Sequence, residues 1–337
     1  MTFFLKLLIS FVLIGYVLFS ADLFSMAGWL KLFSVFAEAD LLLLFVSIFY
    51  AFFIDWISSI KVYFISRAKD MEIRLGALYR MYLIGRFFNL VMPTSIGGDV
   101  VRVNLLAKAT GRMSDSAAVI FVERLSGFLV LVLLTLGSLF FVLKQKTDMH
   151  WVLPLAVLAL AGMVLMIYAF FNHGLFIRIE TALLKFSGKW LRKFLFKFEK
   201  FRLSVSGFAG SPGSLLWAII HSVIFYLFAI GNIWLSAYVF SDQIRIWDML
   251  TAVPVMMFIM NFPISIGGIG LMEFSYAFVF GLYGIDPAAA VSTAILMRFK
   301  ILLLGAFGWG LFTFQRKDIP AVAVPGGPVS APGAEYK

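Results

Sequence analysis

Four arginines lie in or beside strongly apolar segments of the sequence, where a charged side chain is costly unless it has a partner of opposite charge. They are Arg86, Arg102, Arg124 and Arg298. Arginine binds phosphate oxygens in pairs, because its planar guanidinium group presents a fork of N–H donors. The four side chains therefore predict a binding site for a phosphate-bearing substrate. The alternative is that each arginine neutralises a carboxylate of the protein itself.

Polar neighbours of the first two arginines are candidates for both roles. Asp99 and Arg102 are three residues apart, so they lie on one face of a helix. The same spacing relates Arg86 to Asn89. An internal ion pair and an internal hydrogen bond are the simpler interpretations. In the functional interpretation, all four residues contribute to substrate binding.

Three further acidic residues lie within or beside apolar segments. Glu123 directly precedes Arg124 and is expected to pair across to the preceding segment, which would lower the cost of its charge. Glu273 is expected to offset Arg298 in the same way. Asp55 stands near the middle of its segment. It could line a cavity, carry a coupling proton or neutralise a nearby arginine, and we favour neutralisation.

A hexapeptide repeat interrupts two of the apolar segments. The sequence PTSIGG at 93–98 returns as PISIGG at 263–268, 170 positions later, with Pro93 and Pro263 as the expected helix breakers. Non-helical backbone at membrane depth is tolerated only where protein buries it or where it lines a wet cavity. Matching breaks in two halves of a chain are typical of the substrate site of a transporter.

The small residues at both breaks are candidate ligands for a phosphate. They are Ser95, Gly97, Gly98, Ser265, Gly267 and Gly268. The glycine pairs are expected to let backbone N–H groups turn together into a concave nest at the start of the returning helix, with the serines capping that helix. Such a nest favours an anion. Alternatively, the glycines only permit close helix packing.

The composition predicts an all-α integral membrane protein, since 62% of the residues are hydrophobic, 39 are Phe and 14% are charged. With no cysteine, thiolate catalysis and Cys-ligated metal sites are excluded. The three histidines share no ligand spacing, so we expect no metal and no cofactor. The net charge of +10 falls mainly between apolar segments and comes with no nucleic-acid-binding motif, so nucleic acid is not an expected partner.

The apolar segments predict six full transmembrane helices and two re-entrant helical hairpins. The full spans are expected at 3–20, 41–65, 117–143, 151–171, 214–240 and 290–314, and the hairpins at 77–108 and 249–283. Three spans between the hairpins make the two halves inverted repeats, at about 41–143 and 214–314. Lys and Arg gather on one side, which predicts cytoplasmic N- and C-termini in the plasma membrane, with 21–40 and 241–248 as external loops.

Two remaining segments complete the domain prediction. The membrane domain is expected over 1–317, and the Pro/Gly/Ala-rich residues 318–337 form a disordered tail. Basic and apolar residues alternate at helical spacing over 178–206. This pattern predicts an amphipathic helix on the anionic cytoplasmic leaflet. A passive topology anchor is the simpler interpretation.

Two motif units resemble those of a known family. The units are Gly-Gly-Asp-x-x-Arg at 97–102 and Ile-Gly-Gly-x-Gly-x-x-Glu at 266–273. Together with Arg86, Arg124 and Arg298, they resemble the transmembrane region of lysylphosphatidylglycerol synthases, also called the flippase-like domain family. The resemblance spans about 5–315. It implies movement of an anionic-headgroup lipid between leaflets, with a lipid- or glycan-modifying enzyme as a candidate partner.

The sequence departs from this family at two points. Met272 stands where the family often has arginine, and no aminoacyl-transferase domain follows residue 315, so lysyl transfer is not expected. A non-transporting scaffold for a modifying enzyme is the rival function. An integral transferase is less favoured, because no metal-binding motif, nucleotide-binding motif or nucleophile–base set is found. Charges beside broken helices favour a carrier, because a scaffold has little reason to retain their cost.

Overall fold

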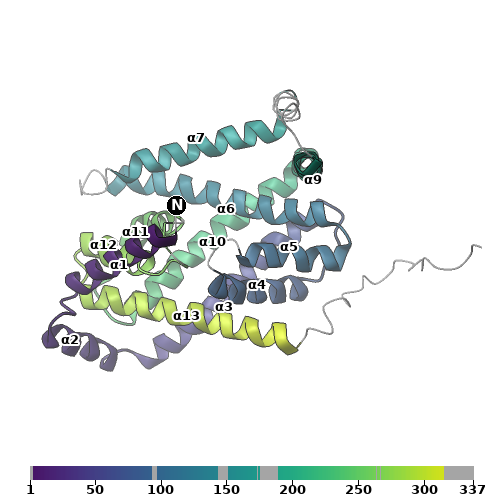
Figure 1. The fold of residues 1–337 in the computed structure, drawn as a ribbon. Helices are drawn as coiled ribbons and strands as arrows, with labels where there is room; N and C mark the ends of the chain where they lie inside the picture. Colours follow the sequence, from purple (N-terminus) through teal and green to yellow (C-terminus); the bar gives the residue numbers. More distant parts are fainter. Residues whose placement is uncertain are drawn as a thin grey trace, which may run out of the picture.

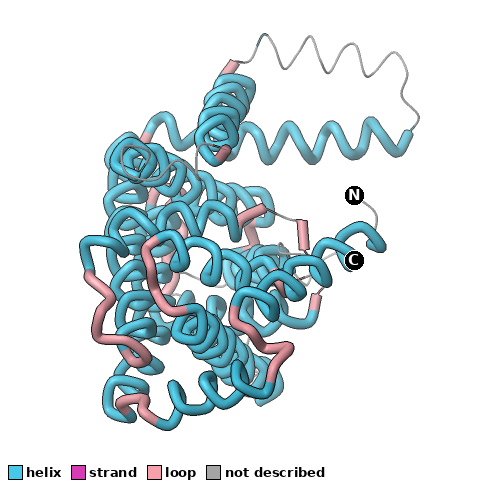
Figure 2. The backbone as a smooth tube through the Cα atoms, turned by 90° about the vertical axis from the view of Figure 1, so that its left-hand side faces the viewer, coloured by secondary structure: helices cyan, strands magenta, loops and turns pink. Residues whose placement is uncertain are grey.

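The structure is a computed structural model that describes residues 3–92, 97–142, 151–172, 174, 189–262, 264–265 and 267–314. Across these residues the chain is helical and shows no strand (Figure 2). The elements are α1 (Phe3–Ser20), α2 (Met26–Ala37), α3 (Leu41–Arg67), α4 (Leu75–Val91), α5 (Gly97–Thr110), α6 (Met113–Val142), α7 (Val152–Phe171), α9 (Lys189–Ser206), η2 (Gly207–Gly210), α10 (Pro212–Tyr238), α11 (Ile246–Met260), α12 (Leu271–Leu282) and α13 (Pro287–Phe314). The predictions for Pro93, Ser95, Pro263 and the tail at 318–337 lie outside the described residues.

Four of these helices are long and apolar enough to cross a membrane, namely α3, α6, α10 and α13. Each has between 27 and 30 residues. At 1.5 Å per residue, such helices exceed the roughly 30 Å hydrocarbon core of a bilayer. The other two predicted spans correspond to α1 and α7, which are apolar but shorter.

Two sets of four helices share one arrangement. In each set, two long helices flank a pair of short ones, as α3 and α6 flank α4 and α5, and α10 and α13 flank α11 and α12. α3 packs on α10, while α4 packs on α13 and α6 packs on α11. Exchanging the two sets therefore maps the α3–α10 contact onto itself and interchanges the α4–α13 and α6–α11 contacts. This is the pattern of a pseudo-two-fold axis.

The two sets run in opposite directions. Phe64 near the end of α3 stacks on Trp217 near the start of α10, and Tyr50 earlier in α3 lies against Phe228 later in α10. Equivalent helices are thus antiparallel. The α4–α5 pair accordingly joins its neighbours at the right of Figure 1, and the α11–α12 pair joins them at the left. The repeats are therefore inverted with respect to each other.

The short helices differ from spans in length. α4, α5, α11 and α12 have 17, 14, 15 and 12 residues, which corresponds to about 18–26 Å each. Each pair packs as a hairpin, and a break separates its two helices. The described part of the second break is residues 261–262, 264–265 and 267–270, and its backbone N–H and C=O groups need partners from the protein wherever water is absent.

Large apolar side chains remain exposed on the outside of the bundle. They include Phe45 and Phe49 on α3, Trp217 on α10, and Phe299 and Trp309 on α13. A water-soluble monomer rarely exposes so much contiguous apolar surface. The surface fits a lipid environment.

The peripheral helices differ in part from expectation. Residues 21–40, expected as a loop, contain α2, which Ser25 caps by accepting the Gly28 N–H at 3.0 Å. α2 is tied to the start of α13 by the Lys31–Asp286 salt bridge at 2.5 Å. Burial opposes ionisation of Asp286, but hydrogen bonds from Lys31 and from the Ala288 N–H hold its pKa below the ordinary value.

Helix α9 covers the described part of the predicted amphipathic segment. Its Phe201 packs edge-on against Phe121 of α6 at 5.4 Å between ring centroids. Ser204 donates to Asp115, at the start of α6, over 2.5 Å. The apolar face of α9 is therefore fixed to the bundle.

Candidate functional site

A charge cluster, largely buried except for Arg124, lies where the first hairpin meets α6. We call it the first-hairpin cluster, and it comprises Lys61, Asp99, Arg102, Glu123 and Arg124. Arg124 binds Asp99 with two hydrogen bonds, from Nε and from Nη2, each 2.8 Å long. Arg102 is ion-paired with Asp99 and reaches Glu123 over 3.3 Å. The expected pairing of Asp99 with Arg102, and of Glu123 with the hairpin, is thus present.

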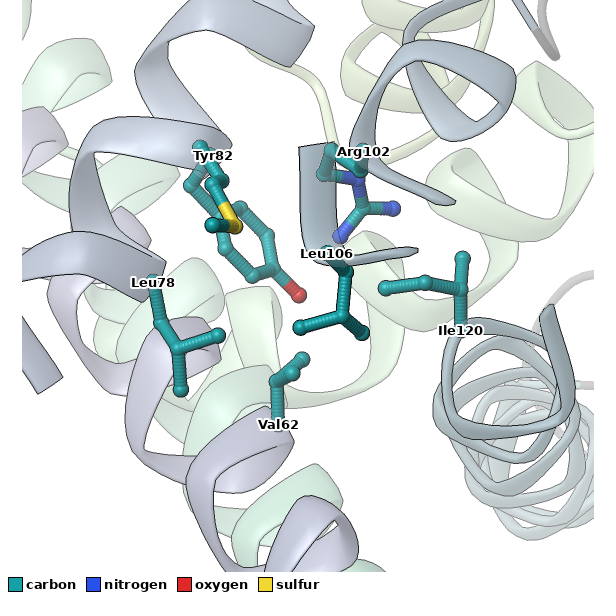
Figure 3. A pocket seen from close by; sticks show the side chains of 7 residues that line it. Val62, Leu78, Tyr82, Arg102, Leu106 and Ile120 are labelled. Atoms are coloured by element: carbon teal, nitrogen blue, oxygen red, sulfur yellow. The ribbon is translucent and has the colours of Figure 1, made fainter. Parts of the chain in front are cut away.

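Arg102 is the most enclosed arginine of this cluster, with a side chain that is 4% exposed. Its guanidinium group lies over the Tyr82 ring, 4.4 Å from the centroid, which adds a cation–π interaction to the ion pairs. Figure 3 shows the two side chains beside a small cavity. The cavity has room for about one water molecule, so it does not accommodate a lipid head group in this conformation.

Asp55 neutralises an arginine, as the favoured interpretation expected. Its fully buried carboxylate accepts hydrogen bonds from Arg86 Nε at 3.1 Å and from Arg86 Nη2 at 2.5 Å. The expected bond between Arg86 and Asn89 is not formed. Asn89 Oδ1 instead accepts the Gly98 N–H at 2.8 Å and so joins α4 to the start of α5.

Sequence reasoning missed Lys61, which lies toward the C-terminal end of the apolar segment at 41–65. Its Nζ donates to the Glu123 carbonyl oxygen at 2.6 Å and lies 3.9 Å from the Glu123 carboxylate. The signal was available, because a lysine inside a predicted span needs a partner just as an arginine does. With Lys61 and the Asp55–Arg86 pair included, four basic side chains face three acidic ones, so the region keeps one excess positive charge.

The second hairpin carries a smaller cluster built on Glu273 and Arg298. Glu273 Oε1 accepts from Arg298 Nε at 2.9 Å and from Nη2 at 2.7 Å. The other oxygen, Oε2, accepts the Gly270 N–H at 2.8 Å. Arg298 Nη2 also donates to the Gly268 carbonyl oxygen at 3.1 Å. One ion pair, expected from the sequence, therefore satisfies two groups of the broken backbone.

The two clusters are built on one equivalent ion pair. Asp99 is the third residue of α5, and Glu273 is the third residue of α12. Each binds an arginine 25 positions later, Arg124 or Arg298. The structural repeat therefore has a spacing of 174 residues at these pairs, whereas the hexapeptides are 170 apart. The second break holds four additional residues before its returning helix.

This difference corrects the expected capping role of Ser265 and places the two glycine pairs in different local structures. Gly98 lies in the first turn of α5, where a methyl group would be 2.2 Å from the Gly85 carbonyl oxygen, so it serves close helix packing. Gly267 and Gly268 instead precede α12, with φ values of +58° and +73° that favour glycine. Ser265 does not cap α12, which begins after Gly270. Its buried hydroxyl has no hydrogen-bond partner in the described chain.

The arginines differ in accessibility. The side chain of Arg124 is 53% exposed and that of Arg86 is 36% exposed, and Arg298 is also partly exposed. Arg124 uses Nε and Nη2 for Asp99, and Nη1 has no protein acceptor among the described residues. Arg124 can therefore donate to a phosphate through its remaining N–H groups while it keeps both hydrogen bonds to Asp99.

Inverted repeats, two broken helices and paired charges beside both breaks define a multi-pass helical membrane protein. The chain belongs to the family described as the lysylphosphatidylglycerol synthase TM region, whose model matches residues 3–308. It is also similar to the UPF0104 membrane protein MJ1078 of Methanocaldococcus jannaschii, with 24% identity over 233 residues, or 65% of this chain and 92% of that relative. No solved structure matches the chain.

Proposed function

We propose that the protein is a carrier that moves a lipid with an anionic head group between the leaflets of the plasma membrane. The observation that carries this proposal is the equivalent pair of partly exposed arginines, Arg124 and Arg298, each held by a carboxylate beside a broken helix. The excess positive charge of the first-hairpin region favours an anionic partner. Phosphate is the lipid group that an arginine fork matches best.

The inverted repeats supply a route for alternating access. In this proposal α4–α5 and α11–α12 are re-entrant, and each opens one side of the membrane to the shared centre. The phosphate binds Arg124 in one state and Arg298 in the other. A ligand shifts such an equilibrium only by binding the two states differently. The unequal charge of the two clusters provides that difference. The chain carries out no covalent chemistry in this scheme.

Substitution of the exposed arginines tests the proposal. In proteoliposomes, Arg124→Gln and Arg298→Gln are each expected to slow translocation of a fluorescent phosphatidylglycerol at least about tenfold, which corresponds to a rise of about 1.4 kcal/mol in the activation free energy of translocation. Lysine at either position should restore only part of the rate, since it keeps the charge but loses the fork. Accessibility to a membrane-impermeant quencher measures the rate.

Arg112 provides the matched control, because it is an exposed arginine in the turn before α6 that binds the Lys69 carbonyl oxygen at 2.6 Å. Arg112→Gln should translocate lipid at the parental rate. Parental rates in both the Arg124 and Arg298 variants would reject the phosphate-binding role. No translocation by the parental protein would favour the scaffold function instead.

The proposed topology places both termini in the cytoplasm, with six spans and two re-entrant hairpins. Ala209 and Gln243 are exposed positions just beyond the two ends of α10, and the chain has no native cysteine. Cysteine at 243 should react with an impermeant maleimide on intact cells, or on spheroplasts where an envelope blocks the reagent. Cysteine at 209 should react only after lysis. The reverse labelling pattern would show that the protein has the opposite orientation in the membrane.

A further inference from the structure

Lys300 is a buried amine that the proposed lipid-binding site does not use. Its side chain projects from α13 and the residue is 2% exposed. Nζ donates to Asn232 Oδ1 at 2.9 Å and to Ser236 Oγ at 2.7 Å, both on α10. Ser236 Oγ in turn donates to the Asn232 carbonyl oxygen. Every partner of the amine in the described chain is therefore a neutral group.

The inverted repeat shows what is missing at this position. Lys61 is residue 21 of α3, and Asn232 is residue 21 of α10. Ser126 is residue 14 of α6, and Lys300 is residue 14 of α13. Each repeat thus places one lysine between its first and last long helices. In the first repeat the lysine belongs to the first helix, α3, and in the second repeat it belongs to the last helix, α13.

The second repeat has no carboxylate at the position equivalent to Glu123. At the 174-residue spacing of the equivalent ion pairs, Glu123 corresponds to Met297. In the first repeat the Glu123 carboxylate lies 3.9 Å from Lys61 Nζ. In the second repeat the Met297 sulfur contacts Asn232 Nδ2 at 3.7 Å and Ser236 Oγ at 3.4 Å. A thioether supplies no charge, so Lys300 lacks the carboxylate that its counterpart has.

No other charged side chain compensates Lys300 in the described chain. α13 packs against α2, α3, α4, α10 and α12. The carboxylates within α13 and these helices are those of Asp55 and Glu273, which pair with Arg86 and Arg298, while Asp286 just before α13 pairs with Lys31. The phenols of Tyr50, Tyr79, Tyr82, Tyr226 and Tyr276 are uncharged at neutral pH. His221 of α10 lies against Phe64 and Trp217, on the α3 side.

The hydrogen bonds fit an amine better than an ammonium. An ammonium group has three N–H donors, whereas a neutral amine has two. The surroundings of Nζ provide two acceptors, Asn232 Oδ1 and Ser236 Oγ. A third donor would be buried without a partner, together with an uncompensated charge, and both are costly away from water.

We propose that Lys300, Asn232 and Ser236 form a proton-binding site, which is empty when α10 and α13 enclose it and is filled when the site opens to water. The proton adds to the lone pair of Nζ and leaves by the same route, so no other co-reactant is needed. Coupling of this proton to lipid movement rests on the proposed carrier function. The existence of the site does not.

The pH dependence of unfolding tests the site without any transport measurement. Below the ordinary lysine pKa of about 10.4, the unfolded chain holds a proton on Lys300 that the enclosed folded state lacks. The unfolding equilibrium constant should therefore fall by up to about tenfold more per pH unit in the parental protein than in Lys300→Met, as pH rises from about 7.5 to 9.5. Equilibrium unfolding in mixed detergent micelles measures both profiles.

Met297→Glu is the matched variant, because it restores the carboxylate of the first repeat while leaving Lys300 in place. The amine should then stay charged in both states, so this variant should show the flat profile of Lys300→Met. Lys300→Gln replaces Lys300→Met if the methionine variant does not fold. Profiles parallel to that of the parental protein in all variants would overturn the proposal.

A second measurement separates the site from its coupling. In proteoliposomes, an imposed pH gradient should change the rate of lipid translocation several-fold in the parental protein and leave Lys300→Met unaffected. A gradient effect of equal size in both would overturn coupling through Lys300. If neither protein translocates lipid, the carrier function fails, while the unfolding profiles still decide the proton site.

Discussion

Replacing Arg102 with glutamine is expected to destabilise the folded protein by about 3–5 kcal/mol, the cost of removing one partner from a buried ion-pair network. Arg102 is the enclosed cation that contacts both Asp99 and Glu123. Its loss leaves two carboxylates in a buried region with less compensation. The Tyr82 ring also loses the guanidinium group that covers it.

Arg124→Gln provides the comparison within the same cluster. Arg124 also binds Asp99, but its side chain is 53% exposed and Asp99 keeps Arg102 when Arg124 is lost. Exposed ion pairs contribute about 1 kcal/mol or less. Equilibrium unfolding should therefore separate a large loss at Arg102 from a small one at Arg124, whereas the translocation rate should fall in both. Equal stability losses would show that the burial of Arg102 does not make it more important for stability than Arg124.

Several of these ion pairs could be predicted from the sequence, because local geometry or the cost of burial dictates them. Asp99 and Arg102 share a helical face at a spacing of three residues. Glu273 and Arg298 are charges in apolar segments of one repeat, and such charges seek each other. The apolar segments likewise predicted the long helices, since their lengths exceed the hydrocarbon thickness.

Contacts set by tertiary packing could not be predicted in the same way. The partner of Arg86 is Asp55, 31 residues away on another helix, and the nearby Asn89 binds backbone instead. The glycine pairs that end the matching hexapeptides also adopt different structures. Gly97 and Gly98 are the first two residues of α5, whereas Gly268 lies in a turn before α12, where its carbonyl oxygen accepts a hydrogen bond from Arg298. Because the hexapeptides are 170 residues apart and the equivalent helix positions 174, the four additional residues before α12 could not be recognised from the hexapeptides alone.

The lysines show a different limit. Lys61 and Lys300 stand in apolar segments, and each was detectable as a buried charge from the sequence alone. Their equivalence was not detectable, because the lysine lies on the first helix of one repeat and on the last helix of the other. The equivalence of the two lysines becomes evident only when the helices of the two repeats are matched in the structure.

A methyl group at Gly308 is expected to destabilise the protein by about 1–3 kcal/mol, the usual cost of overpacking a close contact. Gly308 lies where α13 of one repeat crosses α4 of the other, and its Cβ would be 1.9 Å from the Leu83 carbonyl oxygen. The clash is with backbone, so a rotamer change cannot relieve it and the two helices must separate. Since this contact joins the repeats, Gly308→Ala should also slow lipid translocation.

Gly310→Ala is the control on the same helix, because a Cβ there meets no atom within 4 Å. Alanine favours a helix over glycine by about 0.5–1 kcal/mol, so this variant should be neutral or slightly stabilised. Unfolding in mixed micelles should therefore show a loss of stability for Gly308→Ala and no loss for Gly310→Ala, two residues further along the same helix. Equal behaviour of the two variants would mean that α4 and α13 do not approach each other this closely, and the packing between the inverted repeats would have to be revised.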